Sequence, residues 1–232
     1  MKIGIMQPYF FPYIGYWQLM NVVDKYVIYD DVNYIKGGWI NRNRILIGGK
    51  AQYIHLLLKG ASPNKLINQV GVSNDPIARR KLLSTLKMNY SKAPYWEMVN
   101  PVLEKIIRYN ADNAAQFLEY QLKEIADYLE IDTEIMVSSD IDKNNGLKGE
   151  EKVIEICKIL GADTYINAIG GRALYSKDRF HEEGIELRFL QTGDIVYQQY
   201  LQEFISDLSI IDVMVFNSKK RVQEMLEEFT LL

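Results

Sequence analysis

The chain has 232 residues, of which 48% are hydrophobic and 25% are charged, and these values are typical of a globular protein that buries a full core. Its formal net charge of −3 gives no electrostatic reason to expect nucleic acid as a partner. One cysteine excludes an internal disulfide, no signal peptide precedes the first strand pattern, and no apolar run approaches the ~20 residues of a membrane span. We therefore expect a soluble, cytoplasmic protein with no membrane insertion.

Residues 1–31 have the pattern of a β–α–β unit. Apolar runs at residues 2–6 and 26–29 are typical of buried strands, and the apolar spacing of residues 17–23 favours a helix between them. A unit of this kind implies parallel strands and a right-handed crossover. In parallel sheets, ligands bind beyond the carboxyl ends of the strands.

Residues 7–16 and the pair Asp30 and Asp31 fall at these carboxyl ends, so we expect the functional site there. Tyrosine is abundant, with 16 copies, and its flat face and hydroxyl suit stacking on a sugar or base. The tyrosines of this stretch could equally fill the surface of the sheet. Neighbouring residues of a strand point to opposite faces, so only one carboxylate is expected to face the cleft, and we choose Asp31.

A second cluster follows at residues 32–49. Its glycine pair, Gly37 and Gly38, lets the backbone turn tightly or approach a ligand. Trp39 with Arg42 and Arg44 could stack on a ring and hold phosphate, and the alternative is an exposed hairpin with ordinary surface arginines. In the next expected strand, at residues 52–58, His55 is either a core residue or a catalytic group.

The rest of the chain alternates between strand and helix patterns, which favours an α/β fold. We expect a single domain over residues 1–232, with a helical subdomain at about 76–130 inserted beside a mostly parallel, Rossmann-like sheet. The expected strands are 66–72, 133–138, 164–168, 185–190 and 195–197. The expected helices are 76–90, capped by Asp75, 95–108, 114–129, 150–160, stopped by Gly161, 176–183, and 208–228, capped by Ser206 or Asp207.

Two loops and one thiol complete the local predictions. The polar segment 140–149 is a candidate loop over the site, and Gly170, Gly171 and Arg172 follow a strand end as ligand-binding loops often do. Cys157 lies in a helical apolar pattern and is expected to be a buried structural thiol. The sequence has no phosphate-binding glycine loop, no nucleophile elbow, and no Cys and His cluster for zinc.

The opening Met-Lys-Ile-Gly-Ile-Met-Gln-Pro-Tyr-Phe-Phe-Pro-Tyr-Ile-Gly-Tyr, the pair Asp30 and Asp31, and residues 38–42 resemble the WbqC-like family. So does segment 204–217, which contains Ser209 and Asp212. The resemblance covers essentially the whole chain. Members occur in bacterial gene clusters for O-antigen and other surface polysaccharides, which implies a role in making or decorating a sugar. The family label glycine transferase implies attachment of an aminoacyl group to an amino sugar.

A weaker resemblance links the segment 13–16, Tyr-Ile-Gly-Tyr, to the His-x-Gly-His motif of HUP-class nucleotidyltransferases such as pantothenate synthetase. In that class the histidines contact ATP phosphates. Tyrosine can donate a hydrogen bond to phosphate but adds no positive charge, which counts against adenylation. The segment 217–221 resembles the late basic phosphate motif of the same class, and it could equally be a solvated helix face.

These observations favour a transferase that modifies a nucleotide-linked amino sugar by N-acyl or N-aminoacyl transfer. A glycosyltransferase using a nucleotide sugar, with metal at Asp30 and Asp31, and a non-catalytic binding protein are the alternatives. The cofactor is left open, with ATP and Mg²⁺ as one option, and so is self-association into a homo-oligomer. The candidate catalytic residues are Asp31, Asp30 and His55, and the candidate substrate-binding residues are Gln7, Tyr9, Tyr13, Gly15, Tyr16, Trp39, Asn41, Arg42, Arg44, Arg172, Ser209 and Asp212.

Overall fold

Strand β1 (Lys2–Met6) lies inside a six-stranded sheet with the strand order β10-β9-β8-β1-β2-β7. In the computed structural model, which describes residues 1–200 and 203–232, the first five of these strands in chain order are parallel and β10 is antiparallel to β9. The chain runs outward from β1 through β2 to β7 and then crosses to the other side of β1, as in doubly wound sheets. The prediction of a Rossmann-like, mostly parallel α/β fold is confirmed.

The remaining elements flank this sheet. Its other strands are β2 (Lys25–Ile28), β7 (Glu134–Val137), β8 (Thr164–Ala168), β9 (Glu186–Thr192) and β10 (Phe229–Leu231). The helices are α1 (Ile14–Val22), α2 (Pro76–Tyr90), α3 (Trp96–Arg108), α4 (Ala114–Leu129), α5 (Gly149–Leu160), α6 (Lys177–Glu182), α7 (Ile210–Phe216) and α8 (Lys219–Met225). Two antiparallel pairs stand apart from the sheet, β3 (Arg42–Ile47) with β4 (Lys50–His55), and β5 (Leu58–Lys59) with β6 (Gly71–Val72). No helix within the described ranges is long and apolar enough to cross a membrane.

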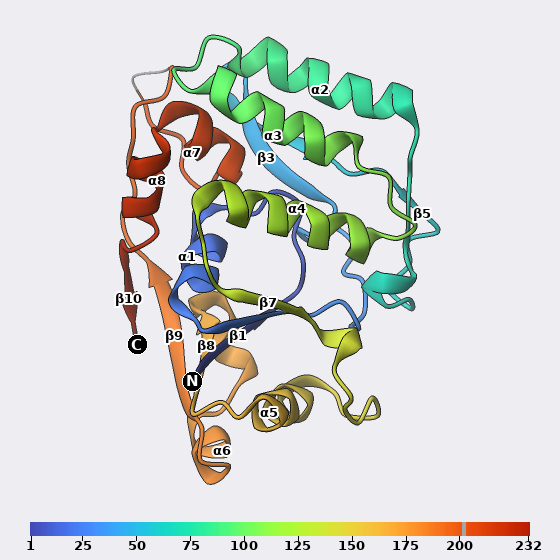
Figure 1. Cartoon of the computed structure of the whole chain (residues 1–232), viewed down its shortest axis with the longest axis vertical. Coiled ribbons are helices and arrows are strands. Elements are labelled where there is room, and N and C mark those ends of the chain that lie inside the picture. The colour runs from blue at the N-terminus through green and yellow to red at the C-terminus, as the bar shows by residue number, and fades with distance from the viewer. Residues whose placement is uncertain (201–202) are drawn as a thin grey trace.

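Helices cover both faces of the sheet (Figure 1). On one face, Ile3 and Ile5 of β1 pack with Cys157 of α5 and Phe180 of α6 in one buried cluster. The predicted buried position of Cys157 is confirmed, and burial raises the pKa of its thiol to about 12. On the other face, α1 and the helices α2, α3 and α4 share a larger core.

Local signals explain several helix ends. The side chain of Asp75 accepts a 2.9 Å hydrogen bond from the Ile77 amide, and Pro76 takes the first helical position, so α2 begins where the sequence predicts. Gly161 ends α5 with a φ of 71°, a left-handed conformation that glycine adopts without steric cost.

The prediction of one long helix over 208–228 is wrong. Ser209, rather than Ser206 or Asp207, caps α7, and the chain leaves the helical conformation at Asn217. Ser218 then caps the separate helix α8, because its hydroxyl accepts from the Arg221 amide. The chain ends in β10, which takes the free edge of β9. The strand predicted at 195–197 is absent from the described structure, because β10 occupies the edge it would need.

Two other strand predictions need correction. The strand predicted at 52–58 is split, since β4 ends at His55 in a hairpin with β3 and the next two-residue strand, β5, pairs with β6. The strand predicted at 66–72 is mostly a 3₁₀ turn, Ile67–Gln69, followed by the short β6. The backbone amide of Ile67 donates to the carbonyl of Val32 (2.9 Å), so this turn docks beside the end of β2 instead of joining the sheet.

Candidate functional site

A cavity of about 600 Å³ lies at the carboxyl ends of β1 and β8. The strand order reverses between these two strands, and ligands of open α/β sheets bind at such a switch point. The cavity is lined by Ile5, Met6, Gln7, Tyr9, Pro12, Tyr13, Tyr29, Ile35, Trp39, Asn43, Arg44, Asn167, Ala168, Gly170, Gly171, Leu174, Tyr175 and Asp207. The predicted site residues Gln7, Tyr9, Tyr13, Trp39 and Arg44 therefore face one common space.

The floor of the cavity is the loop between β1 and α1, and side chains from distant elements hold its backbone. Gln121 of α4 accepts from the Phe11 amide and donates to the Tyr9 carbonyl, both at 3.0 Å. Asn43 of β3 donates to the carbonyl oxygens of Phe10 (3.1 Å) and Phe11 (2.8 Å). The loop is thus fixed by two buried amides that the sequence places far from it.

Phe11 sits at the centre of these contacts with a φ of 43°, a left-handed conformation that is unfavourable for a bulky residue. Its ring is fully buried, and its carbonyl also accepts from the Ser209 hydroxyl at 2.8 Å. Local strain of this kind persists only where many surrounding contacts hold the backbone in place. Strained residues are found most often at functional sites. Ser209, a predicted substrate-binding residue, thus lies behind the loop as a support.

Five aromatic residues, Tyr9, Tyr13, Tyr29, Trp39 and Tyr175, contribute to the cavity wall. Burial raises the pKa of the phenols of Tyr9 and Tyr13, so both are neutral hydrogen-bonding groups at ordinary pH. The buried hydroxyl of Tyr29 has no hydrogen-bond partner within the described ranges, and burial also raises its pKa. Aromatic faces with a few polar groups at the tips suit a ligand that combines flat or apolar parts with hydroxyls.

Arg44 is the one cationic side chain among the described residues that line the cavity. Its guanidinium stacks 5.7 Å from the centre of the Trp39 ring and donates to the Asp207 carbonyl at 3.1 Å. Its Nε–H is buried and has no partner among residues 1–200 and 203–232. A guanidinium oriented by stacking on a ring suits an anionic oxygen of a ligand.

Arg42 lies on the same face of the hairpin but is not part of the cavity lining. It stacks 4.4 Å from the centre of the Tyr53 ring and donates to the carbonyl of Gly38 (3.2 Å) and to that of Gly37. Trp39 and Tyr53 lie 6.2 Å apart, so rings and guanidinium groups continue outward from the mouth of the cavity. The predicted hairpin is therefore present, and one of its two arginines reaches the cavity.

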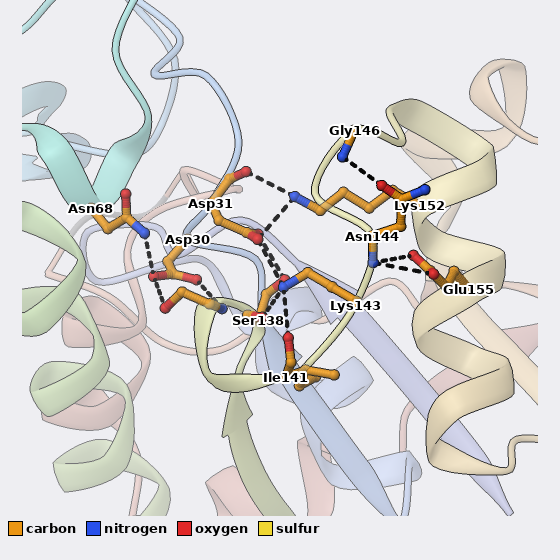
Figure 2. Close-up of polar contacts among 11 residues, drawn as sticks. Asp30, Asp31, Asn68, Ser138, Ile141, Lys143, Asn144, Gly146, Lys152 and Glu155 are labelled. Atoms are coloured by element: carbon orange, nitrogen blue, oxygen red, sulfur yellow. Dashed lines mark hydrogen bonds and ion pairs between the residues drawn. The ribbon is translucent and has the colours of Figure 1, made fainter.

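Asp31 does not line the cavity, and Figure 2 shows its carboxylate between two lysines. Lys143 and Lys152 both lie 2.9 Å from Oδ2, and the Ser138 hydroxyl donates to Oδ1 at 2.7 Å. The side chains are only 9% exposed for Asp31, 1% for Lys143 and 6% for Lys152. Burial alone would raise the pKa of Asp31, but hydrogen bonds from the lysines and Ser138 outweigh it and lower the pKa. Asp31 is held ionised and fully engaged.

The Asp31 cluster supports the cavity wall from behind. Lys152 also donates to the Asp31 carbonyl at 3.0 Å, and its ammonium lies 5.3 Å from the centre of the Tyr29 ring. Asp30 accepts from the amide and hydroxyl of Ser139 (2.9 and 2.7 Å). It also accepts from the Asn68 side chain (3.0 Å), as Figure 2 shows. Within the described part of the chain, no group of three or more His, Cys, Asp or Glu side chains could hold a metal ion.

The polar segment predicted as a loop over the site belongs to the same cluster. Lys143 donates to the carbonyls of Ser138 and Ile141, and the Asn144 amide donates to the Glu155 carboxylate on α5 (Figure 2). This segment is therefore pinned between the end of β7 and α5, and it lines the Asp31 cluster instead of the cavity.

The other predicted residues near the first loop take structural positions. Tyr16 is buried and donates from its hydroxyl to the Gln7 carbonyl at 3.0 Å. A Cβ at Gly15 would lie 2.3 Å from Thr192 Oγ1 and 2.5 Å from the Tyr13 hydroxyl, so only glycine fits beneath Tyr13. Asn41 accepts from the Tyr34 hydroxyl at 2.8 Å. These three positions shape the cavity without lining it.

Asp212, His55 and Arg172 lie outside the cavity lining. Asp212 is buried and accepts from the hydroxyls of Tyr90 and Tyr197 (2.7 Å each) and from Gln199 (2.8 Å), and burial raises its pKa. His55 is exposed at the end of β4, and Arg172 is exposed in the 3₁₀ helix Ile169–Leu174.

The late basic segment 217–221 also lies away from the cavity lining. Lys219 pairs with Glu130 at 2.6 Å and Arg221 pairs with Glu228 at 2.7 Å. The two cations thus pair with carboxylates at the surface, as expected for a solvated helix face.

Sequence reasoning missed several lining residues, among them Asn43, Asn167, Tyr175 and Asp207. Asn167 carried a signal, because it is a polar residue at the end of an apolar strand pattern and precedes a glycine pair. A Cβ at Gly171 would approach the Asn167 amide nitrogen to 2.7 Å, so that glycine makes room for the side chain. Asp207 carried no such signal, since it reads as a helix cap.

Comparisons with known proteins identify relatives of this chain by sequence. The chain is 28% identical over 217 residues to the uncharacterized protein Rv1507c of Mycobacterium tuberculosis, and the match covers 92% of each chain. No solved structure matches the chain. The sequence model of the WbqC-like protein family matches residues 7–224, from the first loop to α8. The chain therefore belongs to the WbqC-like protein family.

Proposed function

We propose that the switch-point cavity binds a nucleotide-linked sugar and that the protein is a transferase acting on it. In this proposal an acyl or aminoacyl group, such as glycyl, passes to an amino group of the sugar during synthesis of a bacterial surface polysaccharide such as O-antigen. The observation that carries the proposal is a cavity of about 600 Å³ lined by four tyrosines and Trp39, with the cationic residue Arg44 in its wall. Ligand pockets of this size and character accept drug-sized molecules.

Each part of the ligand has a matching group in the proposal. Arg44 holds the diphosphate, because it is the one cationic residue among the described lining residues and its guanidinium is fixed by Trp39 and by the Asp207 carbonyl. The faces of Tyr9 and Tyr13 stack on the sugar or the base. Gln7 and Asn167 offer amides to hydroxyl groups.

Asp31 enters the proposal as a positioning residue. A general base must reach the proton that it removes, and the Asp31 carboxylate already accepts from Lys143, Lys152 and Ser138. Its contribution is to fix Lys152 against Tyr29. Asp30, His55 and Arg172 are given no part in ligand binding, because they do not line the cavity.

Thermal melting and calorimetry test the binding step. Purified protein is titrated with ATP, UDP, UDP-glucose, UDP-glucosamine and the corresponding dTDP sugars. A ligand at 100 times its Kd raises the free energy of unfolding by about 2.7 kcal/mol, which is visible as an increase in Tm. We expect nucleotide sugars to raise Tm in the wild type and to do so much less in Arg44→Ala. The matched control, Arg188→Ala, removes a surface arginine outside the cavity and should respond as the wild type does.

A response to ATP alone, or to no nucleotide sugar, would overturn the proposal. Transfer itself is followed by mass spectrometry of the amino sugar after incubation with acyl or aminoacyl donors. A second candidate is a non-catalytic binding protein, which is favoured because the candidate catalytic residues Asp30, Asp31 and His55 do not line the cavity. Binding without a mass change under any donor would support this candidate.

A further inference from the structure

Asp207 holds the one carboxylate among the described residues that line the cavity. It lies in the turn before α7, where its φ is 55°, a left-handed conformation that Asp and Asn adopt more readily than most residues. The side chain is exposed, and its Oδ2 accepts from the Ser206 hydroxyl at 3.1 Å. Asp207 is therefore a charged group at the rim of a mostly apolar space.

The backbone around Asp207 is fixed to the cavity floor. Arg44 donates from its guanidinium to the Asp207 carbonyl, and the Ser209 amide donates back to the Arg44 carbonyl at 2.8 Å. The Ile210 amide donates to the Pro12 carbonyl at 3.0 Å. The turn that carries Asp207 is therefore attached to both β3 and the loop after β1, and its backbone is held beside Arg44 at the edge of the cavity.

The neighbours of the carboxylate are suited to a cation. Burial raises the pKa of the Tyr13 phenol and the negative charge of Asp207 adds to the rise, so the carboxylate lies within electrostatic reach of that ring. Aromatic faces and a carboxylate together attract an ammonium group, since both the ring quadrupole and the anion favour positive charge. Arg44, the anion-binding group of the same rim, is held to Asp207 through its carbonyl.

We propose that Asp207 binds a primary amine of the ligand, so that the cavity selects molecules carrying an amine and a phosphate together. This inference rests on the proposed function and adds to it the group that distinguishes an amino sugar from a neutral sugar. Asp207 acts here as a specificity-determining residue, and Arg44 supplies the binding energy common to both kinds of sugar.

The test compares two ligands that differ by one group, UDP-glucosamine and UDP-glucose, by calorimetry at about pH 6, where a primary amine is protonated. We expect the wild type to bind UDP-glucosamine at least about tenfold more tightly than UDP-glucose, because a hydrogen bond between charged groups contributes this much to affinity. Asp207→Asn should lose this preference while its Kd for UDP-glucose stays within about twofold. Asparagine keeps the size of the side chain and tolerates the left-handed backbone, so the turn is retained.

Two further variants sharpen the comparison. Asp178→Asn makes the same change of charge on the exposed side of α6, outside the cavity, and should keep the full preference. Arg44→Ala should raise the Kd of both ligands by a similar factor. The inference is overturned if the wild type binds the two sugars equally, or if Asp207→Asn keeps the preference. If neither sugar binds the wild type, the proposed function is overturned together with this inference. That outcome can be told apart from equal binding of the two sugars and from a preference that Asp207→Asn retains.

Discussion

The side-chain amide of Asn43 donates a 2.8 Å hydrogen bond to the carbonyl oxygen of Phe11, the residue whose backbone is left-handed at the floor of the cavity. The same amide nitrogen donates to the Phe10 carbonyl at 3.1 Å, so one buried side chain on β3 serves two consecutive carbonyl groups. The inserted hairpin therefore determines the shape of the loop that follows the first strand.

Asn43→Ala should lower the free energy of unfolding by about 1–3 kcal/mol, because the Phe10 carbonyl loses its donor, while the Phe11 carbonyl keeps the Ser209 hydroxyl. We also expect weaker binding of nucleotide sugars, since the loop no longer holds Tyr9 and Tyr13 in place. Urea denaturation and calorimetry measure the two effects. Asn89→Ala is the matched control, because the Asn89 amide donates only to the Thr85 carbonyl within α2. Equal stability of the two variants would contradict the role of Asn43.

Asp31→Asn should destabilise the fold by about 3 kcal/mol, because it leaves two nearly buried lysines without their shared anion. A catalytic base would show the opposite result, with lost turnover and an intact fold. Glu134→Gln, which breaks the surface pair with Lys25, is the control and should cost less than about 1 kcal/mol. Wild-type stability in Asp31→Asn would contradict the structural role.

The same variant has a defined pH dependence. The folded pKa of Asp31 lies below its value in the unfolded chain, so the native state binds fewer protons. The contribution of Asp31 is therefore complete above about pH 4 and is lost as the pH falls through the folded pKa. The difference in unfolding free energy between wild type and Asp31→Asn should narrow as the pH is lowered from about 7 to 3. A constant difference would argue against titration of Asp31.

Asp212→Asn should cost about 1–3 kcal/mol, because the asparagine amide would face the Tyr90 hydroxyl where an oxygen now accepts. The contribution of Asp212 to stability changes with pH in the direction opposite to that of Asp31. The folded pKa is raised by burial, so the stabilising contribution is complete below about pH 4 and is lost as the pH rises through the folded pKa. Urea denaturation should show that the difference in unfolding free energy between the wild type and Asp212→Asn becomes smaller as the pH rises. Affinity for nucleotide sugars should not change, and a large change would place Asp212 in the site.

Gly15→Ala should displace the Tyr13 side chain, since its Cβ would lie 2.5 Å from the Tyr13 hydroxyl and 2.3 Å from Thr192 Oγ1. We expect a loss of about 1–3 kcal/mol of stability from overpacking and a clear loss of ligand affinity. Gly170→Ala is the control for stability, because a Cβ there meets no atom within 4 Å. Melting curves and calorimetry on both variants test this, and an unchanged Kd in Gly15→Ala would exclude Tyr13 from binding.

Local patterns were sufficient to predict the class of fold and the edge of the sheet at which the cavity lies. The strands β1 and β2 are apolar runs whose direction follows from the short crossover, and the carboxyl end of β1 is then fixed without further information. Caps such as Asp75 and Gly161 act within one turn of helix, so they too can be recognised from neighbouring residues.

The partners of polar side chains could not be predicted in the same way. Asp31 looks like a free carboxylate at a strand end, and its lysines belong to a segment that the intervening helices bring back to β2. Asp212 likewise depends on Tyr90 of α2. The prediction of a single helix over 208–228 was wrong because Ser209 and Ser218 each cap a separate helix. Apolar spacing alone does not reveal such a break.

The position of β1 has a consequence for synthesis on the ribosome. β1 and α1 are made before their distant partners: Lys2 pairs with Thr164 of β8, and Gln18 of α1 donates to the carbonyls of Met225 (2.8 Å) and Glu228 (3.0 Å). Contacts between residues so far apart form slowly, because a long loop must close before they stabilise anything. A nascent chain therefore carries the first half of the cavity before the second half has been made, and the cavity lining is complete only after Asp207 has been added.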